Sequence, residues 1–370
     1  MHKSLGEDLE IQILVRLPAK SLMRFKCVRQ SWNVLIKSPY FVKRHMQMGM
    51  QSEDRRLMIF PSCIFEERNQ VIMTLSVHDN PTLNPSPTGD MLIKMPYTVY
   101  SYGHCNGVFC LQECDDLILW NPTTREFQLL PQPSYEIVLD VNDEAFIGFG
   151  ADPNTNEFKV VKLSIHRPIR WRRSISFSLA ELYNHSTKSW TLIPLPVPPS
   201  ETILYHSDRR FNTYNTLVNG VYHWLVGPNH DDHDFNILCF DFHTNQFQLL
   251  ESPVRYSPLD HDIAEINGSL AYVCKFLGRF DPINEIRIWV KDQQGWVKKY
   301  NLNVSLDRCL DIQCVLSKGK DDVQVLDRKS RQDLMKIYDK DCNVLHQFQC
   351  YLTTKLWIHE YVQSIVPLST

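Results

Sequence analysis

The sequence predicts an α+β chain of two parts: a small module of three helices, then an all-β domain arranged as a six-bladed propeller. Two observations predict this. Helical periodicity is confined to the first 45 residues or so. From about residue 55 onward, short β-rich runs alternate with Asn, Asp, Gly and Pro turns, and one turn motif recurs along the chain.

The helical part begins with apolar residues at helical spacing between Glu7 and Leu17. Pro18 ends this helix, because the residue before a proline is pushed out of the α region. Further short helices are predicted over 21–25 and 28–36, and Ser38-Pro39 is expected to close the unit. A module this short would expose more apolar surface than it can bury. The exposed surface predicts either a partner-binding site or a helical cap on the following domain.

A hairpin motif repeats in the remaining chain. It consists of an apolar strand, Asn or Asp, two residues, usually Thr, two more residues, an aromatic residue and a second apolar strand. We expect the Asn or Asp side chain to bond the backbone two residues on, and the aromatic residue to pack back across the strand pair. The motif occurs at 119–130, 150–161, 182–193 and 239–250, with looser copies at 288–296 and 325–330.

Asn-Gly pairs precede strands at Asn106-Gly107, Asn219-Gly220 and Asn267-Gly268, where a tight hairpin turn with positive φ is expected. Combined with the repeated motif, they define units of about 40 to 50 residues, the period of four-stranded propeller blades. A two-sheet sandwich is the rival architecture, but the period favours the propeller. The predicted blades lie near 100–135, 145–197, 213–255, 262–302 and 310–345, with 56–99 and 346–366 together closing a sixth.

Composition narrows the function. The formal charge is −3 and apolar residues make up 43%, which fits a large core and argues against a nucleic-acid binder. No apolar run is long enough to span a membrane, and the charged N-terminus is not expected to be a signal peptide. The 11 cysteines are scattered, so reduced thiols are expected, in the cytoplasm and also in the nucleus.

The first 45 residues resemble the plant F-box. The matching segments are 5–9, 13–22, 24–28, 31–32, 35–36 and 38–39. One departure is Gly6, where the family usually has a proline that preorganises the helix start, so the first adaptor contact is expected to be weaker. The resemblance implies docking onto a Skp-type adaptor of a cullin–RING ubiquitin ligase. The adaptor-facing residues would be Leu5, Leu9, Ile13, Leu14, Leu17, Pro18, Leu22, Phe25, Val28 and Trp32, about a third of them internal.

The β-rich part resembles the kelch-like F-box-associated domain of plant F-box proteins. The resemblance rests on segments 105–107, 121–125, 148–150 and 219–224, and it is closest in character to the S-locus F-box group. It implies an F-box over 1–45, first strands over 46–99 and a substrate-recognition domain over 100–366. The implied partner is a protein substrate destined for ubiquitination, with pistil S-RNases as the candidate of the S-locus group. A propeller lectin or small-molecule-binding protein with a helical cap is the alternative.

Catalytic and metal chemistry find little support in the sequence. Cys105, Cys110 and Cys114 have no zinc-ligand spacing, and the first two are expected to point to opposite faces of a strand. The segment 230–234 places two histidines among carboxylates, but a solvated loop is the favoured interpretation. No nucleophile elbow or phosphate-binding loop occurs. The sequence therefore predicts no cofactor, no metal and no enzymatic activity.

Two loops are the candidates for target binding, since loops carry specificity on propellers. The segment 166–173 is basic and carries an aromatic residue, a composition favoured at interfaces. Acidic segments at 140–144 and 229–234 would complement a basic target. For each segment, a merely solvated loop is the alternative. The named candidates are Arg167, Arg170, Trp171 and Arg172 in the basic loop, and Asp231, Asp232 and Asp234 in the acidic one.

Overall fold

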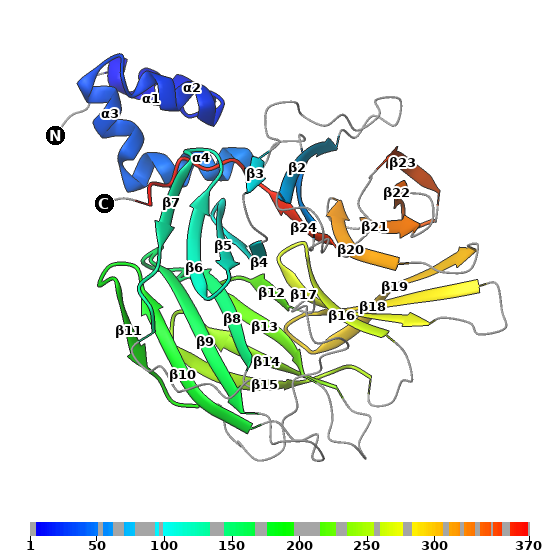
Figure 1. Cartoon of the computed structure of the whole chain (residues 1–370). Coiled ribbons are helices and arrows are strands. Elements are labelled where there is room, and N and C mark those ends of the chain that lie inside the picture. The colour runs from blue at the N-terminus through cyan, green and yellow to red at the C-terminus, as the bar shows by residue number, and fades with distance from the viewer. Residues whose placement is uncertain are drawn as a thin grey trace. The chain divides into compact units, whose positions relative to one another are not determined.

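The computed structural model is shown in Figure 1. It describes residues 5–50, 55–61, 70–77, 93–95, 99–133, 144–166, 176–195, 215–226, 235–254, 260–276, 283–305, 311–318, 322–329, 334–341, 343–349 and 356–368. The chain forms two compact units. Unit 1 comprises residues 1–130 and 358–370, and unit 2 comprises residues 131–357.

Helices open unit 1, and the described residues place them at α1 (Leu5–Leu14), α2 (Ala19–Phe25), α3 (Gln30–Lys37) and α4 (Pro39–Met50). After α1 the chain tightens before Pro18, since the amides of Arg16 and Leu17 bond carbonyls three residues back, at 3.2 and 3.0 Å. None of these helices, within the part of the chain that is described, is long and apolar enough to cross a membrane.

The prediction that Ser38-Pro39 closes the helical unit is wrong, because α4 begins at Pro39. Proline is well suited to the first helical position, where its missing N–H would have no intrahelical partner. The Ser38 hydroxyl accepts a hydrogen bond from the Phe41 amide at 3.3 Å, as a helix cap does. The dipeptide thus ends α3 and starts α4 in one step.

Two four-stranded sheets belong to unit 1. The first has the order β24-β1-β2-β3, so its outermost strand comes from the far end of the β-rich region and lies beside β1. The second has the order β4-β5-β6-β7. Their bounds are β24 (Leu356–Tyr361), β1 (Arg55–Pro61), β2 (Gln70–Val77), β3 (Ile93–Met95), β4 (Val99–Cys105), β5 (Val108–Glu113), β6 (Asp116–Asn121) and β7 (Glu126–Leu129).

Unit 2 holds four further four-stranded sheets among its described residues, and in each the strands follow one another in chain order. The first contains β8 (Glu144–Ala151), β9 (Phe158–His166), β10 (Ser176–Asn184) and β11 (Ser189–Leu192). The second contains β12 (Asn215–Val218), β13 (Val221–Val226), β14 (Asn236–Asp241) and β15 (Gln246–Glu251). The others are β16 (Asp260–Ile266), β17 (Ser269–Phe276), β18 (Ile283–Lys291) and β19 (Trp296–Ser305), then β20 (Asp311–Lys318), β21 (Asp322–Lys329), β22 (Leu334–Tyr338) and β23 (Val344–Gln349).

The three Asn-Gly pairs form the predicted tight turns between the first and second strands of their sheets. Both residues of each pair have positive φ, with Asn106 at 53° and Gly107 at 75° as one example. This combination defines the turn type whose twist matches that of the flanking strands. The sequence prediction is confirmed for these turns.

The Asn/Asp-x-x-Thr turns are confirmed as well. The side-chain oxygens of Asn121, Asp152 and Asp241 accept hydrogen bonds from the amides two residues on, at 2.9, 2.8 and 2.7 Å. The turns at Asn121 and Asp241 join the third strand to the fourth, whereas that at Asp152 joins β8 to β9, the first and second. The same turn chemistry therefore serves two places in the repeat.

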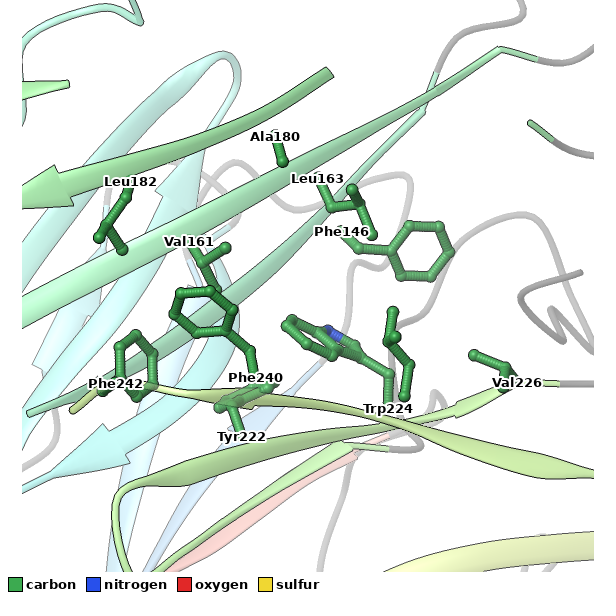
Figure 2. Packing of buried hydrophobic residues seen from close by; sticks show 11 residues of the cluster. Phe146, Val161, Leu163, Ala180, Leu182, Tyr222, Trp224, Val226, Phe240 and Phe242 are labelled. Carbon is green, nitrogen blue, oxygen red and sulfur yellow. The ribbon is translucent and has the colours of Figure 1, made fainter. Parts of the chain in front are cut away.

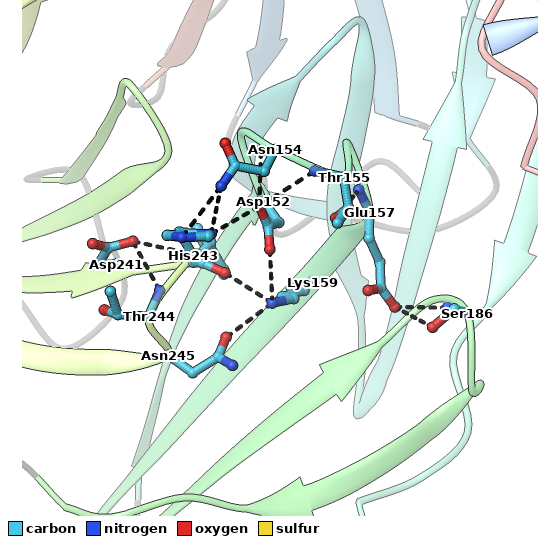
Figure 3. Close-up of polar contacts among 11 residues, drawn as sticks. Asp152, Asn154, Thr155, Glu157, Lys159, Ser186, Asp241, His243, Thr244 and Asn245 are labelled. Carbon is cyan, nitrogen blue, oxygen red and sulfur yellow. Dashed lines mark hydrogen bonds and ion pairs between the residues drawn. The ribbon is translucent and has the colours of Figure 1, made fainter.

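The core of unit 2 lies between neighbouring sheets. Figure 2 shows Phe146, Val161 and Leu163 pointing from β8 and β9 toward Tyr222 and Trp224 of β13. At one end of these two sheets, the turns after β8 and β14 share a polar network, drawn in Figure 3. Because those turns meet at one end, the C-terminal ends of β9 and β13 lie at the other.

Candidate functional site

The helical unit has its own core. Buried side chains of α1, α2, α3 and α4 pack together. The segment between α1 and α2 is held against α4, because the His45 ring nitrogen Nε2 lies 3.0 Å from the Leu17 carbonyl oxygen. Burial lowers the pKa of His45, and the Leu17 contact raises it less. The ring is therefore neutral and fixed near pH 7. The core residues of the helices are Ile11, Leu14, Val15, Ala19, Leu22, Ile36, Phe41 and Val42.

A carboxylate of α1 fixes the start of α3. The Glu10 side chain accepts hydrogen bonds from Arg29 Nη1 at 3.1 Å and from Trp32 Nε1 at 3.3 Å. The Trp32 ring also lies 5.5 Å from that of Phe25 at the end of α2. These contacts hold the first three helices in one arrangement, so the side chains that they leave outside form a defined surface.

The structure divides the predicted adaptor-facing residues into three groups. Leu9, Ile13 and Val28 are 53, 63 and 66% exposed, and Pro18 is exposed as well. Leu14 and Leu22 are buried in the helical core. The half-buried residues Leu17, Phe25 and Trp32 pack against that core, and Leu5 lies in the first turn of α1. The accessible apolar surface is therefore carried by Leu9, Ile13 and Val28.

Other exposed apolar residues escaped the sequence prediction. Val34 of α3 and Tyr40 of α4 are 66 and 56% exposed, and Met48 is exposed as well. Tyr40 was missed because no helix was predicted to begin at Pro39. For Val34 a signal existed: it is an apolar residue that does not belong to the stripe formed by Val28, Trp32 and Leu35.

The helical unit is basic although the whole chain is slightly acidic. Residues 5–50 contain eight Lys or Arg and three Asp or Glu, a formal balance of +5 against −3 for the chain. The exposed cations include Arg16, Lys20 and Arg24, around the apolar residues described above. Such a surface favours a partner that presents an apolar patch with acidic surroundings.

The two predicted target-binding loops lie outside the described residues, so their named residues stay predictions. Their flanking strands are described. The basic loop, with Arg167, Arg170, Trp171 and Arg172, connects β9 to β10. The acidic loop, with Asp231, Asp232 and Asp234, connects β13 to β14. Both follow the second strand of neighbouring sheets, and the described ends of β9 and β13 lie at the same end of those sheets. The sequence alone did not establish this.

Two pairs of a nucleophile and a histidine occur among the described residues of the sheets, and burial disfavours the reactive form of each. Cys274 Sγ lies 3.3 Å from His261 Nδ1, but burial raises the pKa of the Cys274 thiol to about 12. Ser101 Oγ lies 3.0 Å from His359 Nε2, but burial, with a smaller effect from His104, lowers the pKa of His359 to about 3. At neutral pH the first pair lacks a thiolate and the second lacks a competent base.

Metal ligation has little basis in the described residues, where no group of at least three His, Cys, Asp or Glu side chains is arranged to hold an ion. Cys105 and Cys110 lie on neighbouring strands, β4 and β5, and not on one strand as their spacing in the sequence predicts. The Asn106-Gly107 turn separates them, which a count of positions along a single strand could not take into account.

Comparison with protein families decides the identity of the β-rich region. The F-box associated beta propeller domain matches residues 45–368. The chain belongs to this family of plant F-box proteins. The architecture after the helices is accordingly a β-propeller, as the repeat period predicts.

Curated relatives of this F-box protein agree with that assignment. A putative F-box protein of Arabidopsis thaliana is 27% identical over 310 residues, which cover 82% of this chain and 76% of the relative. An F-box protein and an F-box/kelch-repeat protein of the same plant are 23 and 26% identical. The matches cover 95 and 81% of this chain and 88 and 79% of those relatives.

Solved structures similar to this F-box protein include a fungal lectin from Aleuria aurantia with a six-bladed propeller fold. Its TM-score is 0.39 at 10% identity, with 86% of this chain and 98% of the lectin covered. An oligogalacturonate lyase in complex with manganese gives a TM-score of 0.42 at 8% identity, with 79 and 78% covered. Scores this low carry no argument about activity or ligand. F-box proteins act in general as non-enzymatic substrate receptors of Skp–cullin–F-box ubiquitin ligases.

Proposed function

We propose that this F-box protein docks onto a Skp-type adaptor, and through it onto a cullin–RING ligase, by the exposed apolar face of its helices. The observation that carries the proposal is the exposure of Leu9, Ile13 and Val28 outside the buried cluster to which the helices contribute. Apolar side chains left outside a complete core mark a partner site. The basic surroundings add electrostatic attraction to an acidic adaptor surface.

The β-rich region serves as the substrate receptor in this proposal. Residues 1–45 form the F-box, 46–99 contain the first strands, and 100–366 form the main recognition domain, with six sheets as the blades of a kelch-like propeller. The basic and acidic loops supply the target-binding residues, which is supported by the common end at which the strands before them, β9 and β13, finish. The receptor needs no catalytic group, because holding a target lysine near a charged conjugating enzyme supplies the rate.

The target is a protein in the cytoplasm or nucleus. The resemblance to the S-locus group supports pistil S-RNases as candidates, and the acidic loop would complement a basic surface on the target. Crosslinking of the full chain in pistil extract, followed by mass spectrometry, tests the candidate. Recovery of an S-RNase linked to the β9–β10 or β13–β14 connection supports it. Recovery of unrelated targets, or a glycan array that shows tight sugar binding, contradicts it.

Adaptor docking is tested by charge substitution on the exposed face. Ile13→Glu and Val28→Glu should each weaken binding of a purified Skp-type adaptor at least about a hundredfold, since each buries a charge at an apolar contact. Val344→Glu is the matched control, because Val344 is 49% exposed on β23 and lies outside the helices. Isothermal titration calorimetry measures the affinities. Wild-type affinity in the Ile13 and Val28 variants would overturn the proposal.

A further inference from the structure

The segment that follows β24 lies against both the helices and the sheet β4–β7 of unit 1. Residues Val362–Leu368 leave the sheet β24-β1-β2-β3 in extended conformation, and Figure 1 shows this stretch in red beside α4. More than 300 positions separate it from α1 along the chain. We call Val362–Leu368 the strap.

Polar contacts hold the strap to the sheet side. The Asn121 side-chain amide donates to the carbonyls of Ser364 and Val366, at 3.1 and 2.8 Å. The Thr123 hydroxyl accepts from the Ser364 amide at 3.2 Å, and a Glu126 carboxylate oxygen accepts from the Leu368 amide at 2.8 Å. Asn121 and Ser364 are fully buried. The turn between β6 and β7 therefore binds the strap by its backbone along several successive residues.

The strap packs closely against the turn between β4 and β5. A Cβ placed on Gly107 would overlap the Ser364 side chain and lie 2.7 Å from the Val362 carbonyl oxygen. Gly268, in the equivalent turn between β16 and β17, has the same φ of +75°, and a Cβ there would meet nothing within 4 Å. The first turn thus needs glycine for space as well as for conformation, and the strap is what fills that space.

On its other side the strap reaches into the core of the helices. Ile365 is fully buried in the cluster that contains Leu14, Leu22 and Phe41, and Val366 packs against the same cluster. In extended backbone successive side chains point to opposite sides, which is why Ser364 faces the sheet while Ile365 faces the helices. A helical unit of about 40 residues is too small to bury a sufficient core by itself, and Ile365 completes it.

We propose that the strap is a structural part of the adaptor-docking unit, and that it orders α1, α2, α3 and α4 into the arrangement that binds the adaptor. This inference extends the proposed function and rests on it only for the effect on adaptor affinity. Without the strap, the helices lose a core residue and populate open states more often. The apparent affinity for the adaptor falls in proportion to the fraction of molecules that remain ordered.

The test compares Gly107→Ala and Ile365→Ala with two controls in the full chain without adaptor. Gly268→Ala carries the same backbone strain as Gly107→Ala but no strap, and Ile365→Val preserves the buried branched side chain. Hydrogen exchange of the helix amides is the readout. In both test variants we expect the amides of α1, α2, α3 and α4 to exchange at least about ten times faster than in wild type. In both controls we expect exchange rates near those of wild type. Unchanged exchange in β16, β17, β18 and β19 confirms that the sheets stay folded in the test variants.

Equal rates of helix amide exchange in the Gly107→Ala and Gly268→Ala chains, or in the Ile365→Ala and Ile365→Val chains, would overturn the proposed role of the strap. Affinity for a purified Skp-type adaptor is measured on the same four proteins. A loss of about fivefold or more in the test variants alone supports coupling to docking. If the helices exchange as expected but even the wild-type chain fails to bind the adaptor, the proposed function fails and the strap remains.

Discussion

Lys159 shows how single residues hold neighbouring sheets of unit 2 together. It is 5% exposed, and its ammonium group donates to the Phe242 carbonyl at 2.8 Å and to Asn245 Oδ1 at 3.0 Å, while Asp152 Oδ2 lies 3.6 Å away (Figure 3). Burial alone would raise the pKa of Asp152, but hydrogen bonds from the Asn154 amide and from His243, with the Lys159 charge, hold it below its usual value. The buried charge is thus fully paired.

Lys159→Met should lower the free energy of unfolding by about 3 kcal/mol, because it leaves the Asp152 carboxylate and two acceptors without their cation. Urea denaturation followed by tryptophan fluorescence measures the change. Lys340→Met is the control, since Lys340 is an exposed lysine of unit 2 and its loss should cost under about 0.5 kcal/mol. Equal destabilisation by the two substitutions would show that the buried network contributes nothing beyond surface charge.

Buried histidines predict a loss of stability in mild acid. Burial lowers the pKa of His223 to about 4, with opposing hydrogen bonds to Thr216 and Val221, and burial also lowers that of His104 to about 4. Below pH 6.5 the unfolded chain therefore binds more protons than the folded one. The free energy of unfolding should fall as the pH drops from about 6.5 to about 4.

His223→Gln should flatten that dependence by about 3 kcal/mol over the same window, which is the cost of protonating one imidazole whose pKa is lowered this far. Urea denaturation at a series of pH values from 7 to 4 gives the slope. The substitution keeps a polar side chain near the Thr216 carbonyl, so the comparison isolates titration from the loss of the contact. An unchanged slope would mean that His223 is protonated in the folded protein.

At the scale of elements, local turn chemistry was predictable and its placement was not. Asn-Gly pairs and Asn/Asp-x-x-Thr segments specify backbone conformation from within a few residues, which is why the turns formed as expected. The turn at Asp152 joins the first two strands of its sheet, while its copies at Asn121 and Asp241 join the last two. A motif fixes the hairpin, but only the count of strands before it gives its position in a sheet.

The helical site was predictable in its pattern and less so in its limits. Helical periodicity identified the apolar stripe of the first three helices but could not separate Leu14 and Leu22, which are buried, from Ile13 and Val28, which are exposed. Part of the core also comes from outside the module. Ile365 covers one side of the helices, and no local pattern near residue 365 shows that contact.

The aromatic residue of the repeated motif has a second task at two sites. Trp190 Nε1 donates to the Pro131 carbonyl at 2.7 Å, and Trp296 Nε1 donates to the Glu251 carbonyl at 2.9 Å. Each tryptophan lies on an outer strand, and each bond is made within unit 2. Trp296 thereby ties the sheet β16–β19 to the end of β15 in the preceding sheet, in addition to packing within its own.

Trp190→Phe should cost about 1 to 2 kcal/mol, because it keeps a ring against Tyr183 but leaves the Pro131 carbonyl without its donor. Trp296→Phe should cost less, since Trp296 is more exposed and water can replace the lost donor. Thermal unfolding of both variants beside wild type checks the order. A larger loss for Trp296→Phe would contradict the account of burial.

At the scale of the whole molecule, the two ends of the chain meet within unit 1. β24 lies beside β1, and the strap that follows it completes the helical core. The repeat count in the β-rich sequence predicted a sheet formed by both segments, because five blades left 56–99 and 346–366 to form the sixth together. The involvement of the helices could not be predicted, since nothing in the strap marks it as part of a helical core.

In the proposed function, the helices bind a Skp-type adaptor through Leu9, Ile13 and Val28 while the sheets remain free for a target. Hydrogen exchange of the full chain with and without purified adaptor tests it most directly. We expect adaptor-dependent protection of α1, α2 and α3 and unchanged exchange in the four sheets of unit 2. Protection of those sheets with unaltered helices, or no change anywhere at saturating adaptor, would contradict it.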